Sequence, residues 1–136
     1  MRRIALAAGL LLAACTPPPV QTATACAAPL KPALQVDLYF GRGAEGGREV
    51  SEAEWASFLN EEVTPRFPDG LSVFDVRGQY RNPQGVIERE RTKRLTVVVF
   101  DAPAHLGKVR AIVDSYSRRH GQNSVFRVEQ QVCAGL

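Results

Sequence analysis

Residues 34–42 read LQVDLYFGR, and this stretch decides the fold because its side chains alternate in polarity. The apolar set is Leu34, Val36, Leu38 and Phe40, and the polar set between them is Gln35, Asp37 and Tyr39. A period of two residues predicts a strand that packs one face against a core. We therefore expect Asp37 and Tyr39 to point to the other face of the sheet.

A helix follows this strand, after a glycine-rich loop at residues 41–47. Ser51 and Glu54 have the spacing of a capping box, and Val50 and Trp55 have that of a hydrophobic staple. Pro65 is incompatible with a continuing helix. The sequence thus predicts a helix that is capped by Ser51 and ends at Pro65.

The remaining elements follow from hydrophobic periodicity and turn residues. The patterns predict a helix over residues 104–120 and strands over residues 71–80, 86–100 and 124–132. Turn-forming residues at 82–85 indicate a hairpin, and Gly121 has the place of a C-terminal helix cap. The run at 95–100 is almost entirely apolar, which indicates a central strand.

The resulting order βαββαβ is that of the ferredoxin-like plait, an α+β fold. In this topology, assigned to residues 33–136, a four-stranded antiparallel sheet of order 4-1-3-2 carries both helices on one face. The two most apolar strands, one and three, take the central positions. Strand four lies antiparallel to strand one, so we expect its end, with Cys133, to approach the segment that carries Cys26.

The N-terminus has the features of an export signal. Arg2 and Arg3 precede an apolar run of about 11 residues, which is too short to span a bilayer. The next residues, Leu-Ala-Ala-Cys at 12–15, resemble the lipobox of bacterial lipoproteins. That resemblance implies a signal peptide over residues 1–14, a diacylglyceryl group on the Cys15 thiol, and acylation of the new amino terminus, for example with palmitate. An ordinary secretory signal followed by a chance cysteine is the alternative.

The segment after this signal predicts how the protein sits on the cell envelope. Two or more acyl chains anchor a protein stably, and the Pro-, Ala- and Thr-rich residues 15–32 predict a semi-extended tether. Thr16 stands where Gram-negative lipoproteins bound for the inner membrane usually carry Asp. We therefore expect a membrane-anchored lipoprotein, at the periplasmic face of the outer membrane if the host is Gram-negative.

Charge and length restrict the function of the mature chain. Loss of residues 1–14 removes two positive charges, which leaves +3 − 2 = +1. A nearly neutral exported chain offers no electrostatic basis for binding nucleic acid. The remaining length, about 120 residues, suits one domain with one core.

Two cysteines remain once Cys15 is lipidated. Cys26 and Cys133 form an even pair in an oxidising compartment, so we expect a disulfide. Closing a loop of this size stabilises the fold by ~4–5 kcal/mol in the chain-entropy treatment. Two free thiols or a metal site are the alternatives, although the spacing matches no pattern of metal ligands.

Motifs for catalysis, metals and cofactors are weak. The glycine-rich loop lacks the Lys-Ser/Thr ending of a phosphate-binding loop, and Glu52 and Glu54 follow it, so a surface loop is the better interpretation. His105 and His120 fall at opposite ends of one predicted helix, too far apart to share a metal, and we expect helix-end or surface roles for them. We expect neither a metal nor a cofactor.

The most charged stretch is ERERTKR at residues 88–94. On a strand, Arg89, Arg91 and Lys93 share one face and form a cationic strip that suits acidic partners such as lipid headgroups, anionic glycans or a peptide carboxylate. A solvated hairpin arm whose charges discourage edge pairing is the alternative.

Four segments of the predicted domain carry a further signal: LYFGR at 38–42, VSEAEWASFLNEEVTPRFPDGL at 50–71, RERTKRL at 89–95 and HGQNSVFRV at 120–128. Together they resemble a family of small exported bacterial proteins known only as domain of unknown function 3574. The resemblance covers most of the mature domain and implies a single compact domain and export. It transfers no activity and no catalytic residue.

Three functions remain open at this point. The leading hypothesis is a lipid-anchored binding or interaction domain of the cell envelope, whose uncovered sheet face meets a second copy, another envelope protein or a small ligand. The candidate contact residues are Asp37, Tyr39, Arg42 and the cationic strip, Arg89, Arg91 and Lys93. The rival is a small envelope enzyme of the dimeric ferredoxin-like type, with acid/base candidates Asp37, Tyr39 and Arg91. An inert structural spacer is the third.

Overall fold

The structure, a computed structural model, describes residues 25–122 and 125–136 and has one four-stranded antiparallel sheet with two helices. In chain order the elements are β1 (Lys31–Gly41), a short 3-10 helix (Glu45–Gly47), α1 (Glu52–Phe58), a π-helical turn (Leu59–Val63), β2 (Ser72–Arg81), β3 (Ile87–Val99), α2 (His105–His120) and β4 (Phe126–Ala134). The sheet order β2-β3-β1-β4 is the predicted 4-1-3-2 order counted from the other edge. The predicted ferredoxin-like fold is confirmed.

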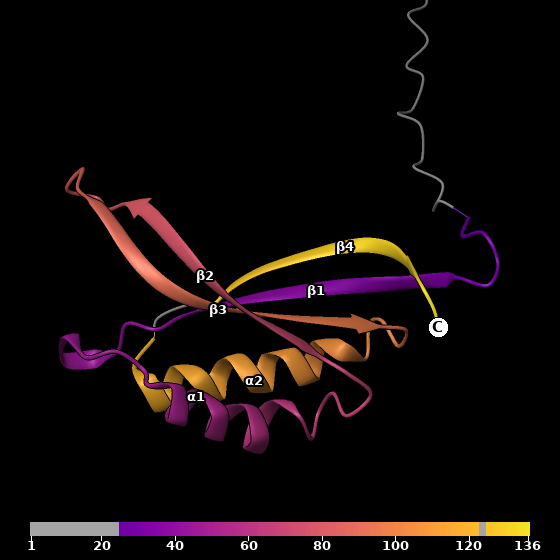
Figure 1. The fold of residues 1–136 in the computed structure, drawn as a ribbon, viewed down its shortest axis with the longest axis horizontal. Coiled ribbons are helices and arrows are strands. Elements are labelled where there is room, and N and C mark those ends of the chain that lie inside the picture. The colour runs from indigo at the N-terminus through magenta and orange to yellow at the C-terminus, as the bar shows by residue number, and fades with distance from the viewer. Residues whose placement is uncertain (1–24, 123–124) are drawn as a thin grey trace, which may run out of the picture.

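Both helices lie on one side of the sheet, and the core fills the space between them (Figure 1). The alternation in β1 works as predicted, because Val36, Leu38 and Phe40 are fully buried toward the helices. Trp55, Phe58 and Tyr116 meet them from the helices, with ring centroids 4.8–5.7 Å from that of Phe40. From β3, the core receives Leu95, Val97 and Val99.

The first helix begins as predicted but ends differently. The Ser51 hydroxyl accepts a hydrogen bond from the Glu54 N–H, and the Glu54 carboxylate accepts one from the Ser51 N–H, which completes the capping box. The α-helix stops at Phe58 and widens into the π-turn, where the Thr64 N–H donates to the Leu59 carbonyl at 2.9 Å. A proline ring clashes with the carbonyl four residues before it. Pro65, two residues after the π-helical turn, is therefore incompatible with a regular α-helix at this point.

The first and last strands of the chain, β1 and β4, differ by a few residues from their predicted boundaries. β1 starts at Lys31, within the predicted tether, and its Pro32 pairs with Cys133. β4 runs to Ala134 rather than to Val132, because its end keeps pairing with the start of β1. Pro32 is tolerated here since it lies next to the first residue of its strand.

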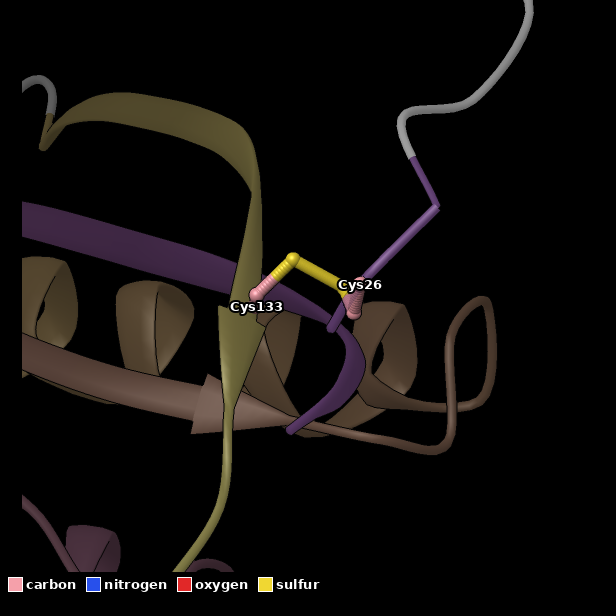
Figure 2. Close-up of a disulfide and its surroundings, with 2 residues drawn as sticks. All are labelled: Cys26 and Cys133. Atoms are coloured by element: carbon pink, nitrogen blue, oxygen red, sulfur yellow. A yellow bond between two sulfur atoms is a disulfide. The ribbon is translucent and has the colours of Figure 1, made fainter. Parts of the chain in front are cut away.

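A disulfide joins Cys26 to Cys133, with the two Cα atoms 5.5 Å apart (Figure 2). The bond fastens the segment before β1 to the end of β4, at the end of the sheet where the antiparallel topology predicted that the two cysteines meet. The predicted lipidation site, Cys15, lies outside the described residues.

None of the helices in residues 25–122 and 125–136 is both long enough and apolar enough to span a membrane.

Candidate functional site: the open face of the sheet

The side of the sheet opposite the two helices, here called the open face, carries no covering element in the described part of the chain (Figure 1). The strand registers fix which side chains it presents. Asp37 pairs with Thr96 on β3 and Val128 on β4, and Tyr39 pairs with Arg94 and Phe126. Asp37 and Tyr39 therefore lie on the open face, as the alternation in β1 predicted.

One row of side chains crosses all four strands of the open face. This aromatic row consists of Phe126 on β4, Tyr39 on β1, Arg94 on β3 and Phe74 on β2, each directly opposite the next. The rings of Tyr39 and Phe126 lie 5.8 Å apart, and the Arg94 guanidinium lies 4.3 Å above the centre of the Phe74 ring. The row offers flat apolar surface with one cation inside it.

The next row is polar at its centre. Asp37 accepts a hydrogen bond of 2.6 Å from the Thr96 hydroxyl and one of 3.1 Å from the Gln35 amide. Asp37 is only 8% exposed, and the two groups that donate to its carboxylate are both neutral. A few polar groups within a mostly apolar binding surface fix the orientation of what binds there.

Large apolar side chains surround this centre and remain open to solvent. Phe126 is 69% exposed and Phe74 44%, and the open face further presents Val98 at 41% and Val128 at 38%. Scattered single residues of this kind are ordinary, but these four lie on one face of one sheet. The open face is therefore a continuous, partly apolar surface.

Arg94 adds to this surface a hydrogen-bond donor that has no partner among the described residues. Its Nε atom is buried, yet it has no hydrogen-bond partner among the described residues. A buried donor without a hydrogen-bond partner costs the folded protein about 1–3 kcal/mol.

The predicted cationic strip lies elsewhere, on the helix side of the sheet. Lys93 is 4% exposed, and its ammonium contacts Glu52 at 2.8 Å and Asp75 at 2.6 Å. Arg91 contacts Glu49 at 3.2 Å. Arg89 pairs across the hairpin with Gln79, beyond the end of β1, and is exposed.

Arg42 joins these cations and is not a surface contact. It is 3% exposed, and its guanidinium donates to the Val50 carbonyl at 2.8 Å and contacts Glu52 at 2.6 Å and Glu49 at 3.3 Å. We call this group, Arg42, Arg91 and Lys93 with Glu49, Glu52 and Asp75, the ion cluster.

The ion cluster fixes the charge states of its members. Hydrogen bonds from Lys93 hold the pKa values of Glu52 and Asp75 below their ordinary values. Burial opposes the charge on Lys93, but its bonds to Asp75 and Glu52 outweigh burial and raise its pKa. The cluster joins the start of α1 to the base of the β2–β3 hairpin, and its cations are already neutralised.

The proposed acid/base set is therefore divided between two faces. Asp37 and Tyr39 lie on the open face, whereas Arg91 lies in the ion cluster on the opposite face. The described residues also contain no group of three or more His, Cys, Asp or Glu side chains that could hold a metal.

Both histidines lie at the ends of α2, as predicted, but neither is a surface residue. His105 is 2% exposed and lies 3.3 Å from Glu129, and His120 is 6% exposed. The rotation of α2 accounts for this, because it buries His105 and leaves the neighbouring Leu106 43% exposed.

Three residues of the open face were missed in the sequence: Phe74, Arg94 and Phe126. Each belongs to a predicted strand, and the alternation in β2 gave a signal for Phe74. The pairing registers were needed to bring all three into one row with Tyr39.

Comparison with known proteins identifies a family and a fold. A family model described as "Protein of unknown function (DUF3574)" matches residues 35–136. No curated protein matches the sequence.

Solved structures with a similar fold include enzymes and other proteins of low sequence identity. A phage SAM lyase in complex with S-methyl-5'-thioadenosine superposes with a TM-score of 0.58 at 14% identity, over 75% of this chain and 90% of that one. CutA1 from Oryza sativa superposes with a TM-score of 0.51 at 7% identity, over 79% and 85% of the two chains. At these identities the likeness concerns the fold alone.

Proposed function

This chain belongs to the DUF3574 family, which is described only as of unknown function, and from that premise we propose a function from its own surface. We propose that it is a lipid-anchored interaction domain of the cell envelope, and that the partner of its open face is a second copy of the same chain. The observation that carries the proposal is the aromatic row, which spans all four strands and which no element of residues 25–122 and 125–136 covers.

The size and composition of the open face support a protein partner rather than a small ligand. Phe74, Phe126 and Tyr39 give wide flat surface, and aromatic residues and arginine are the residues enriched at the centres of protein interfaces. Phe126 at 69% exposure and Phe74 at 44% would lose water contact on association. Such burial is the main favourable contribution to association.

The charges at the centre of this face favour a second copy. The aromatic row carries the Arg94 guanidinium, and the adjacent row carries the Asp37 carboxylate. In a twofold dimer, if one residue contacts another across the interface, the reverse contact also forms. The positive Arg94 of each copy would then face the row of the second copy that carries the negative Asp37, so opposite charges would meet twice in the dimer.

Attachment to a membrane would strengthen this association. We propose that acyl chains on Cys15 hold the protein at the envelope and that the tether runs from Cys15 to the disulfide at Cys26. Restricting both copies to one membrane surface raises their effective concentration without any new contact.

Photo-crosslinking on intact membranes tests the self-association. The photoreactive residue p-benzoyl-phenylalanine replaces Phe74 on the open face or, as a matched control, Leu106 on α2. These two side chains are nearly equally exposed, at 44% and 43%, but lie on opposite sides of the sheet. We expect a product of twice the chain mass from position 74 and none from position 106.

Other results would contradict the proposal. A crosslink from position 74 to a different protein would show that the partner of the open face is another envelope protein and not a second copy. Equal yields of dimer from the two positions would indicate random collision in the membrane.

The anchor has its own test. Replacing Cys15 by Ser removes the thiol that accepts the lipid, so we expect the variant to leave the membrane pellet on cell fractionation. A C15S protein that stays in the pellet would show that something other than lipidation holds it there.

A further inference from the structure

A second surface feature lies at the C-terminal end of α2, away from the open face. A concavity of about 390 Å³ is lined by Arg48, Arg118, Arg119 and His120 together with Gly46 and Gly121. Its walls are the 3-10 segment that follows β1 and the last turn of α2. Four of the six lining residues are cationic or can become so.

The arginines of this concavity keep donors that no carboxylate occupies. Arg48 binds Glu54 through Nη1 alone, at 2.9 and 3.1 Å. Arg119 binds Glu61 and Glu62 through Nη1 and Nη2, at 2.9 and 2.7 Å. Arg118 is exposed and forms no ion pair with any side chain that the structure describes. The three carboxylates do not line the concavity, so the guanidinium groups form its surface.

His120 supplies an independent indication of a ligand. It is 6% exposed, and neither ring nitrogen has a hydrogen-bond partner among the described residues. Its ring packs on Tyr116, with centroids 4.7 Å apart, and this contact holds it at the base of the concavity. A buried imidazole with two unmet nitrogens is costly unless something that enters the concavity bonds to it.

The glycines leave the entrance open. Gly46 has φ of 78°, and a Cβ atom there would meet no atom within 4 Å. Gly121, with φ of 67°, is the left-handed residue that ends α2, and its N–H donates to the Ser117 carbonyl. The carbonyl end of a helix repels anions, so the three guanidinium groups have to outweigh this effect.

We propose that this concavity binds a phosphate group. Phosphate has the geometry that several guanidinium groups recognise together, since each can donate two parallel hydrogen bonds to its oxygens. A phosphate that retains a proton can donate to the unprotonated nitrogen of a neutral His120 or accept from the protonated one, whereas sulfate at neutral pH can only accept.

The position of the site indicates where the phosphate comes from. The disulfide and the start of β1 lie at one end of the domain, and the Glu45–Gly47 segment lies at the other (Figure 1). The site thus lies at the end opposite the tether. A soluble phosphate or phosphorylated molecule fits this placement better than a headgroup of the anchoring membrane.

Calorimetric titration of inorganic phosphate into the full-length lipidated protein in neutral detergent, at constant ionic strength, tests the site. We compare wild type with Arg118→Gln and with the matched control Arg110→Gln. Arg110 is an exposed arginine of the same helix whose ion pair with Asp114 is long, at 3.8 Å. We expect saturable binding that weakens at least tenfold in R118Q and is unchanged in R110Q.

A second readout is nitrogen-15 NMR of the histidine rings. Phosphate should shift the His120 signals in the wild type and leave those of His105 in place. Equal weakening in R118Q and R110Q, or no shift at His120, would overturn the proposal. Binding only to vesicles containing anionic lipid, with none to free phosphate, would overturn the soluble source.

Discussion

Single side chains in this protein combine a packing role with a polar contact, and Tyr116 shows it most clearly. Its ring is fully buried among Phe40 and Phe58, and its hydroxyl donates to the Gly41 carbonyl at 2.8 Å. Burial raises the pKa of Tyr116, so the hydroxyl stays protonated and remains a donor. The contact fastens α2 to the end of β1.

Tyr116→Phe keeps the ring and removes this bond. The Gly41 carbonyl loses a partner, so we expect the free energy of unfolding to fall by about 1–2 kcal/mol. Urea denaturation with an unchanged m-value would measure this loss. An unchanged midpoint would show that another donor, such as water, satisfies the carbonyl.

Glu54 gives the stability a defined pH dependence. The Ser51 N–H, the Ser51 hydroxyl and Arg48, in that order, lower the pKa of Glu54 from 4.5 to about 2 in the folded protein. Its charge therefore stabilises the fold fully above about pH 4.5, and the contribution is lost as the pH falls toward 2.

We expect the stability difference between wild type and Glu54→Gln to be constant above pH 5 and to shrink between pH 4.5 and 2. Glutamine can still accept from the Ser51 N–H, so the comparison isolates the charge. Urea denaturation of both proteins across this range measures the difference, and a gap that persists at pH 2 would contradict the assignment.

At the scale of elements, the ion cluster attaches the first turn of α1 to the sheet. Glu52, in the first turn of α1, contacts the nearly buried cations Arg42 and Lys93. By contrast, Glu61 lies in the π-turn and contacts Arg119, which is 34% exposed. A carboxylate that pairs with two buried cations contributes more to the stability of the fold than one that pairs with an exposed cation.

We therefore expect Glu52→Gln to lower the melting temperature more than Glu61→Gln does. Both changes remove one negative charge from an exposed carboxylate, so the second is a control for net charge. Calorimetric melting of both variants at one pH gives the order, and equal shifts would show that the cluster is no stronger than a surface pair.

The helices and strands also show which features of the fold can be predicted from the sequence and which cannot. The capping box of Ser51 and Glu54 and the alternation of β1 are local, so they predicted the start of α1 and the two faces of the strand correctly. Arg42 was misread because its partners, Glu49, Val50 and Glu52, face it only after the loop folds back. The row from Phe126 to Phe74 depends on pairing between distant strands, and no local pattern encodes that pairing.

At the scale of the whole molecule, one covalent bond closes the fold. The Cys26–Cys133 disulfide spans 107 residues, almost the entire domain. Its removal releases a large loop in the unfolded chain, so we expect a Cys26→Ser/Cys133→Ser double variant to lose about 4–5 kcal/mol. Urea denaturation without reductant measures this, and a loss below about 1 kcal/mol would contradict the entropic explanation.

The same architecture places the surfaces of the domain relative to its attachment. The disulfide lies at the end of the sheet next to the proposed tether, and the open face runs along the length of the sheet. The Glu45–Gly47 segment, whose Gly46 lines the concavity, lies at the other end (Figure 1). A domain held at one end can therefore meet a second copy through its face and leave its far end free for a soluble ligand.

The most direct test of the central claim is sedimentation equilibrium of the detergent-solubilised lipidated protein. Three proteins are compared: wild type, Phe126→Asp on the open face and Leu106→Asp on α2, where both side chains are exposed and carry little of the core. The account predicts dimers for wild type and L106D and a monomer for F126D. A monomeric wild type at all concentrations, or a dimer that persists in F126D, would contradict it.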